Sequence, residues 1–247
     1  MAGNASGERV LHDARLEHAR ILHDPELMEA PSPRFFEPAY WEAAGQLRST
    51  EEGRGTTYIV SPRDGGDWVL RHLWRGGLPG RFVRDRYLWT GSESTRPFRE
   101  LRMLARMRAG GLPVPRPVAA LVRRQGLFYH ADILTSRVPG RPLSTVLQDG
   151  EPDASDWRRI GEVLRAFHDQ GVDHADLSAG NILLDGDTVH LIDFDRGRIR
   201  PQGRWRARNL GRLQRSAVKL LGDEAWGSAP WRECWEALEA GYSAADG

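Results

Sequence analysis

The segment at residues 174–195 constrains the fold more than any other part of this 247-residue chain. It begins with the polar loop HADLSAGN and continues with two apolar runs on either side of Asp185-Gly186. An Asp-Gly pair between apolar runs is typical of a β-hairpin turn. The hairpin is therefore predicted to bring Asp193, at its far end, back beside Asn181, at its start.

These side chains suit the transfer of a phosphoryl group to a hydroxyl. That reaction needs a carboxylate for the attacking oxygen, oxygen ligands for magnesium and positive groups for the phosphates. Asp176 is predicted to orient and deprotonate the hydroxyl, and Asn181 and Asp193 to hold Mg²⁺. The tripeptide HxD alone is an ordinary polar turn, so the catalytic interpretation depends on all three residues together. His174 is predicted to brace the loop rather than to transfer protons.

The pattern around this segment indicates an α+β fold. Short β-rich runs at residues 53–60 and 67–73 flank a glycine-rich turn and predict a hairpin. Apolar spacing predicts a helix over residues 97–111, followed by two strands within residues 118–138. A second helix is predicted over residues 156–170, and a basic helical tail after the hairpin.

These elements divide the chain into two lobes after a polar start. Residues 1–33 are predicted to be a mobile leader, because they are polar and end in a proline-rich stretch. Residues 34–138 are predicted to form a small β-rich N-lobe that includes one helix. Residues 139–247 are predicted to form a mainly helical C-lobe with the catalytic loop.

The loop, the hairpin and the Asp-Phe pair after it resemble the protein-kinase-like superfamily, whose signature is H-R-D-x-x-x-x-N followed by D-F-G. Ala175 replaces the arginine of that signature, so a clamp for an activation-loop phosphate is not evident. Asp195 replaces the glycine, which is more typical of the small-molecule kinases. The resemblance implies a two-lobed kinase fold that uses ATP and Mg²⁺.

The same resemblance implies a phosphate-binding set in the N-lobe. Gly53 and Gly55 correspond to half of the loop that covers the phosphates, although alone they are only a glycine turn. The strand at residues 67–73 corresponds to the one that carries a phosphate-binding lysine, but the sole lysine of the chain is Lys219. Arg71 is predicted to replace it, with Glu100 as its partner, since a guanidinium can bind phosphate and carboxylate together.

Two arginine-rich stretches indicate an anionic acceptor or surface. The net charge of +1 excludes binding of polyanions by bulk charge. Residues 71–108 nevertheless hold ten arginines against three acids, and residues 196–222 hold nine basic residues and no acid. Arginine with tryptophan and tyrosine suits an anionic membrane surface or a phosphorylated glycolipid. The candidates for these contacts are Arg75, Arg81, Arg84 and Arg86, and the alternative is solvated arginine-rich helices.

Composition and hydropathy limit the cellular compartments and the types of site expected for the chain. Cys234 is the single cysteine, which excludes an intrachain disulfide and a cysteine-based zinc site. The apolar runs are too short for a transmembrane helix, and charges near the N-terminus argue against a signal peptide. A cytoplasmic protein is therefore expected. Nucleic acid is not an expected partner, because no nucleic-acid module is recognisable.

Segments spread over about residues 35–222 are similar, in order, to the kinases of 3-deoxy-D-manno-octulosonic acid (Kdo). These segments include LRHLWRGGLPGRFVRDRYLWTG, FHDQGVDHADLSAGNILLD and LIDFDRGRIR. The resemblance implies phosphorylation of the 4-hydroxyl of Kdo on a Kdo-lipid A precursor, in the assembly of the lipopolysaccharide inner core. It also implies a peripheral position on the cytoplasmic face of the bacterial inner membrane, and no obligate protein partner.

Three alternatives remain open. A lipopolysaccharide heptose kinase would use the same catalytic residues. A protein kinase is disfavoured, because an A-P-E motif and a long activation segment are absent from the sequence after Asp193. The missing lysine also leaves open a catalytically weak pseudokinase that acts as a scaffold at the membrane.

Overall fold

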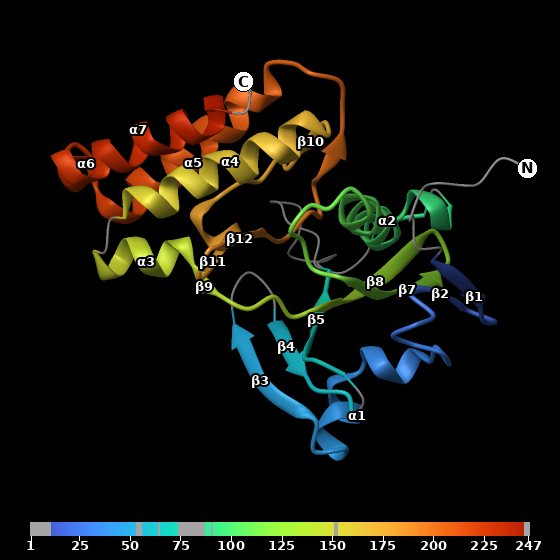
Figure 1. Ribbon diagram of the computed structural model, residues 1–247. Helices are drawn as coiled ribbons and strands as arrows, with labels where there is room; N and C mark the ends of the chain where they lie inside the picture. Colours follow the sequence, from blue (N-terminus) through green and yellow to red (C-terminus); the bar gives the residue numbers. More distant parts are fainter. Residues whose placement is uncertain are drawn as a thin grey trace, which may run out of the picture. The chain divides into compact units, whose positions relative to one another are not determined.

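The computed structural model describes residues 11–52, 56–63, 65–73, 87–89, 91–150 and 153–244. These residues form two compact units (Figure 1). Unit 1 comprises Met1–Ala109 and Pro115–Arg137, and unit 2 comprises Gly110–Val114 and Val138–Gly247. The first unit is rich in β-strands and the second is mainly helical, which confirms the predicted α+β class.

Unit 1 is built on one antiparallel sheet with the strand order β1-β2-β7-β8-β5-β4-β3, and β6 pairs with β8. The predicted hairpin at residues 53–73 is present as β4 and β5. The strand bounds are β1 His12–Arg15, β2 Ala19–His23, β3 Leu47–Glu52, β4 Thr56–Val60, β5 Trp68–His72, β6 Tyr87–Leu88, β7 Pro117–Gln125 and β8 Phe128–Ser136.

Strand β7 is buried on both faces of this sheet, which explains its unbroken apolar run. Ala119 and Leu121 pack in one hydrophobic cluster, whereas Ala120 and Val122 pack in another. Successive side chains of a strand point to opposite faces, so a strand covered on both sides needs apolar residues at every position.

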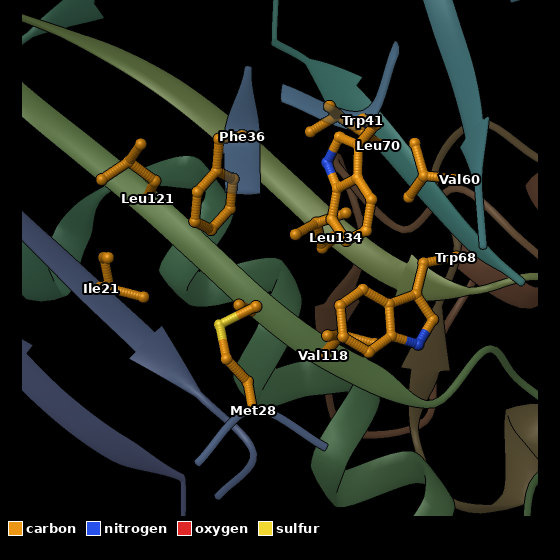
Figure 2. Close-up of a cluster of buried hydrophobic side chains, with 11 residues drawn as sticks. Ile21, Met28, Phe36, Trp41, Val60, Trp68, Leu70, Val118, Leu121 and Leu134 are labelled. Carbon is orange, nitrogen blue, oxygen red and sulfur yellow. The ribbon is translucent and has the colours of Figure 1, made fainter. Parts of the chain in front are cut away.

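Different elements cover the two faces. The helix α2 (Arg96–Ala109) places Phe98 and Leu101 in the cluster that contains Ala120. The other cluster includes Phe36 and Trp41, from η1 (Pro33–Phe36) and α1 (Pro38–Ala43) (Figure 2). The predicted helix at residues 97–111 is thus α2, and it presents one apolar face to the sheet.

The prediction of a mobile leader over residues 1–33 is wrong for the described part of that segment. Strand β2 pairs with β7 and buries Ile21 completely, and β1 pairs with β2 at the edge of the sheet. The polar composition misled the prediction because β1 is mostly exposed and β2 buries only part of its length. Polar side chains are common on edge strands, where they discourage pairing with other chains.

Unit 2 contains a group of helices, of which α4 and α7 pack against each other, and two small sheets. The predicted hairpin after the polar loop is present as β11 and β12, and the basic tail is α5. The bounds are β9 Arg141–Pro142, α3 Leu143–Asp149, α4 Ala154–Asp169, β10 Val172–Asp173, η3 Ala179–Asn181, β11 Ile182–Asp185, β12 Thr188–Leu191, β13 Arg198–Ile199, α5 Trp205–Leu221, α6 Asp223–Trp226 and α7 Ala229–Ser243.

The predicted helix at residues 156–170 begins two residues earlier, as α4. Its N-cap is Asp153, whose side chain accepts a hydrogen bond from the backbone N–H of Ser155 at 2.7 Å. None of the helices described in either unit is both long and apolar enough to cross a bilayer.

Candidate active site

The catalytic loop starts at the end of β10 and is held by a buried polar pair. The Asp173 carboxylate accepts hydrogen bonds from the backbone N–H of Ala175 at 3.1 Å and from Asn209 Nδ2 at 2.9 Å. Asn209, on α5, also accepts a hydrogen bond from the backbone N–H of His174 at 3.1 Å. Asp173 and Asn209 are both buried, so these bonds fix the loop to α5 in a dry environment.

Two residues of this region adopt strained backbone conformations. Ala175 and Asp193 are the non-glycine residues with positive φ among those that the structure describes, with values of 58° and 64°. A side chain in this left-handed region costs about 1–3 kcal/mol, and such strain is frequent at functional sites. Ala175 precedes the predicted base Asp176, and Asp193 is itself a predicted metal ligand.

The hairpin brings the predicted site residues together. The backbone N–H of Ile192 donates to the carbonyl of Asn181 at 3.0 Å, which places Asp193 one residue from that contact. Asn181 Nδ2 donates to the backbone carbonyl of Asp176 at 3.0 Å. Hydrogen bonds therefore link Asp176 to Asn181, and Asn181 to Ile192, the residue before Asp193.

His174 connects the loop to the same place. Its side chain is buried, and Nε2 donates to the carbonyl of Ile192 at 2.9 Å. The ring also lies 4.6 Å from that of Phe194, between centroids. Burial lowers the pKa of His174, which favours the neutral imidazole. This geometry agrees with a bracing residue rather than a proton carrier.

The Asp176 carboxylate has a partner that the sequence interpretation missed. Arg212, on α5, forms an ion pair and hydrogen bond with Asp176 Oδ1. The two residues are 36 positions apart, and the basic tail offered no signal that one of its many arginines would reach this carboxylate. Asn209 was missed for the same reason.

Unit 1 contains the predicted pair of Arg71 and Glu100. Arg71 lies on β5, and its Nη2 donates to Glu100 Oε1 on α2 at 2.5 Å. The Glu100 side chain is 1% exposed and that of Arg71 is 21% exposed, so the carboxylate is buried while the guanidinium reaches solvent. The pairing is as the sequence predicts, whereas its role in binding phosphates stays a prediction.

Several predicted site residues lie outside the part of the chain that the structure describes. These are Gly53, Gly55, Arg75, Arg81, Arg84 and Arg86. Their proposed contacts stay predictions from the sequence.

The lipopolysaccharide kinase (Kdo/WaaP) family matches residues 38–242, which is most of the chain. The chain belongs to this family. It is 44% identical over 211 residues to a 3-deoxy-D-manno-octulosonic acid kinase from Stenotrophomonas maltophilia (strain K279a), covering 83% of this chain and 82% of the relative. It is 41% identical over 203 residues to the enzyme of that name from Vibrio parahaemolyticus, covering 81% of this chain and 85% of the relative.

Solved structures agree on the fold. A structure of WaaP in complex with acyl carrier protein has a TM-score of 0.53 at 17% identity, with 90% of each chain covered. Amicoumacin kinase hAmiN in complex with AMP-PNP, Ca²⁺ and Ami has a TM-score of 0.60 at 11% identity, covering 83% of this chain and 77% of the kinase. The predicted protein-kinase-like fold is confirmed.

Membership of this family also confirms the predicted reaction class. The chain is a phosphotransferase that acts on a hydroxyl group, and membership of a kinase family implies ATP and a divalent metal ion. A kinase function in lipopolysaccharide core synthesis is confirmed as well.

Proposed function

We propose that this chain transfers the γ-phosphoryl group of ATP to the 4-hydroxyl of Kdo on a Kdo-lipid A precursor. The observation that carries the proposal is the assembly of Asp176, Asn181 and Asp193 at one end of a hairpin. Relatives at about 40% identity that are named 3-deoxy-D-manno-octulosonic acid kinases support the choice of acceptor.

Asp176 serves as the base in this proposal. Its carboxylate accepts the proton of the acceptor hydroxyl while that oxygen forms a bond to the γ-phosphorus. The bond from the γ-phosphorus to the bridging oxygen breaks, and ADP leaves with the electron pair. The hydrogen bonds that Asp173 and Asn209 accept from the backbone N–H groups of the loop hold it in position for this step.

The donor set at the hairpin fits a hard cation. Asn181 uses its amide nitrogen on the carbonyl of Asp176, which leaves the amide oxygen as its metal ligand, and Asp193 adds a carboxylate. Oxygen donors of this kind suit Mg²⁺, with phosphate oxygens and water completing the coordination. When bound, the ion neutralises charge on the phosphates. Arg71, held by Glu100, binds the ATP phosphates in this proposal.

A peripheral position on the cytoplasmic face of the inner membrane forms part of the proposal. The basic stretch at residues 196–222 supports it, because cationic residues near an anionic bilayer each contribute about 1 kcal/mol of binding. The lipid acceptor would be found at the same surface.

An acceptor assay tests the proposal. The protein, ATP and Mg²⁺ are incubated with the Kdo-lipid A precursor, with the same lipid without Kdo, or with a heptose-bearing core lipid. Phosphate incorporation only with the Kdo-bearing lipid is expected, and incorporation only with the heptose-bearing lipid would identify a heptose kinase instead. Asp176→Asn should lower turnover at least roughly 100-fold without changing the fold. Equal turnover by the variant would remove Asp176 from the role of base.

A further inference from the structure

Arg212 occupies an unusual place among the basic residues of α5. Five exposed cationic residues are spaced by four, four, three and four positions along this helix and its N-cap, so that they share one face. They are Arg204, Arg208, Arg212, Arg215 and Lys219. Within the described part of the chain, Arg212 alone of these five lies within 4.0 Å of a carboxylate, and that carboxylate is Asp176.

The helix holds Arg212 in this place through a buried neighbour on the adjoining face. Asn209, one turn before Arg212, is 3% exposed and bonds to both Asp173 and His174 of the catalytic loop. A guanidinium carried by an anchored helix is positioned more accurately than one on a loop. Arg212 and Asp176 nevertheless stay accessible, with side chains 44% and 25% exposed. A ligand at Asp176 can therefore reach Arg212.

The pairing has a chemical consequence for the acceptor. Asp176 must receive a hydroxyl, yet Arg212 binds one of its carboxylate oxygens. A neutral sugar offers the guanidinium only hydroxyl oxygens, which are weaker acceptors than this carboxylate. A sugar acid carries a carboxylate on the same ring as the reacting hydroxyl, and an arginine can bind two carboxylate oxygens side by side.

We propose that Arg212 binds the carboxylate of the acceptor sugar and thereby selects sugar acids as substrates. The acceptor carboxylate replaces Asp176 as the partner of the Arg212 guanidinium. The Asp176 oxygen that the guanidinium releases then accepts a hydrogen bond from the acceptor hydroxyl. An acceptor without the negative charge leaves Arg212 paired with Asp176 and reacts slowly. The Arg212–Asp176 pair therefore contributes to substrate specificity as well as to affinity. This inference rests on the proposed function, because it takes Kdo as the acceptor.

The test compares the Kdo-lipid A precursor with the same lipid whose Kdo carboxylate has been converted to a neutral carboxamide. For the unmodified chain, kcat/KM should fall roughly 10- to 100-fold on this conversion, as expected for the loss of charge-assisted hydrogen bonds. Arg212→Gln should lose a similar factor on the acid and show little further loss on the amide. Arg212→Lys, which keeps the charge, should retain part of the preference, and KM for ATP should stay the same in each variant.

Arg208→Gln is the matched control, since it removes an equivalent exposed charge one turn away on the same face. It should keep the preference of the unmodified chain for the acid. If Arg212→Gln also keeps that preference, Arg212 does not bind the acceptor carboxylate and the inference is wrong. If the unmodified chain phosphorylates neither lipid, the proposed function itself fails, and that result is distinct from a retained preference.

Discussion

At the scale of single residues, most of the chemistry is encoded within short distances along the chain. Asp176, Asn181 and Asp193 could be predicted together because one loop and one hairpin connect them. Arg212 and Asn209 could not, because their contacts depend on how a helix more than 30 positions later packs on the loop. A pattern of basic residues at helical spacing does not predict which of them contacts a given carboxylate.

Arg71 provides a prediction at this scale. Arg71→Ala should lower kcat/KM for ATP roughly 10- to 100-fold by removing charge-assisted hydrogen bonds to phosphate. It should also lower the free energy of unfolding by about 3 kcal/mol, because Glu100 is a buried carboxylate that loses its guanidinium. Steady-state kinetics and urea unfolding measure the two effects.

Two further variants separate the contributions of Arg71. Arg71→Lys keeps a positive charge beside Glu100 and should recover part of both losses. Arg99→Ala removes an exposed arginine from the same helix as Glu100 and should change stability by no more than about 0.5 kcal/mol. Unchanged ATP kinetics in Arg71→Ala would show that another group binds the phosphates.

At the scale of elements, the sequence predicts those with a strong apolar period and misses those without one. The helix α4 and the hairpin of β11 and β12 have clear patterns and were found with boundaries within two or three residues. The edge strand β1 and its neighbour β2 were missed, since β1 has no buried residue and β2 is buried over only part of its length. The segment Gly110–Val114 also belongs to unit 2, where Pro113 accepts a hydrogen bond from Leu191.

Two glycines that look alike in the sequence should respond in opposite ways to alanine. A Cβ on Gly161, in α4, would lie 2.1 Å from the backbone oxygen of Leu238 in α7, so Gly161→Ala should destabilise the protein by about 1–3 kcal/mol. On Gly211, in α5, the nearest atom to a Cβ is the end of the Arg215 side chain at 3.4 Å. Gly211→Ala should therefore stabilise by up to about 1 kcal/mol through helix propensity.

Thermal or urea unfolding of the two variants measures the change in the free energy of unfolding that each substitution causes. Equal effects of both substitutions would mean that the close approach of α4 and α7 does not limit the side chain at position 161.

At the scale of the whole molecule, acid should destabilise the fold through a buried histidine. Burial lowers the pKa of His168 to about 4, and its Nδ1 lies 2.7 Å from the hydroxyl of Tyr242. The unfolded chain binds a proton here below about pH 6.5, whereas the folded chain does so only below about pH 4. Protons therefore favour unfolding between these values, and stability rises with pH across that window.

The expected effect is a loss of about 2 kcal/mol in the free energy of unfolding between pH 7.5 and pH 5 from His168 alone. His174, whose pKa burial also lowers, should add to the loss. Urea unfolding at the two pH values measures it, with His168→Gln as the comparison. The variant should show a smaller dependence on pH, and an equal dependence would assign the acid sensitivity to other groups.

The position of the new phosphate group on the lipid decides the proposed function. Tandem mass spectrometry of the Kdo-lipid A precursor, after incubation with the protein, ATP and Mg²⁺, measures it most directly. We expect a gain of one phosphate group, located by fragmentation at the 4-position of Kdo and absent when Asp176→Asn replaces the unmodified protein. A phosphate gained elsewhere on the lipid, or an unchanged lipid mass with the folded protein, would contradict it.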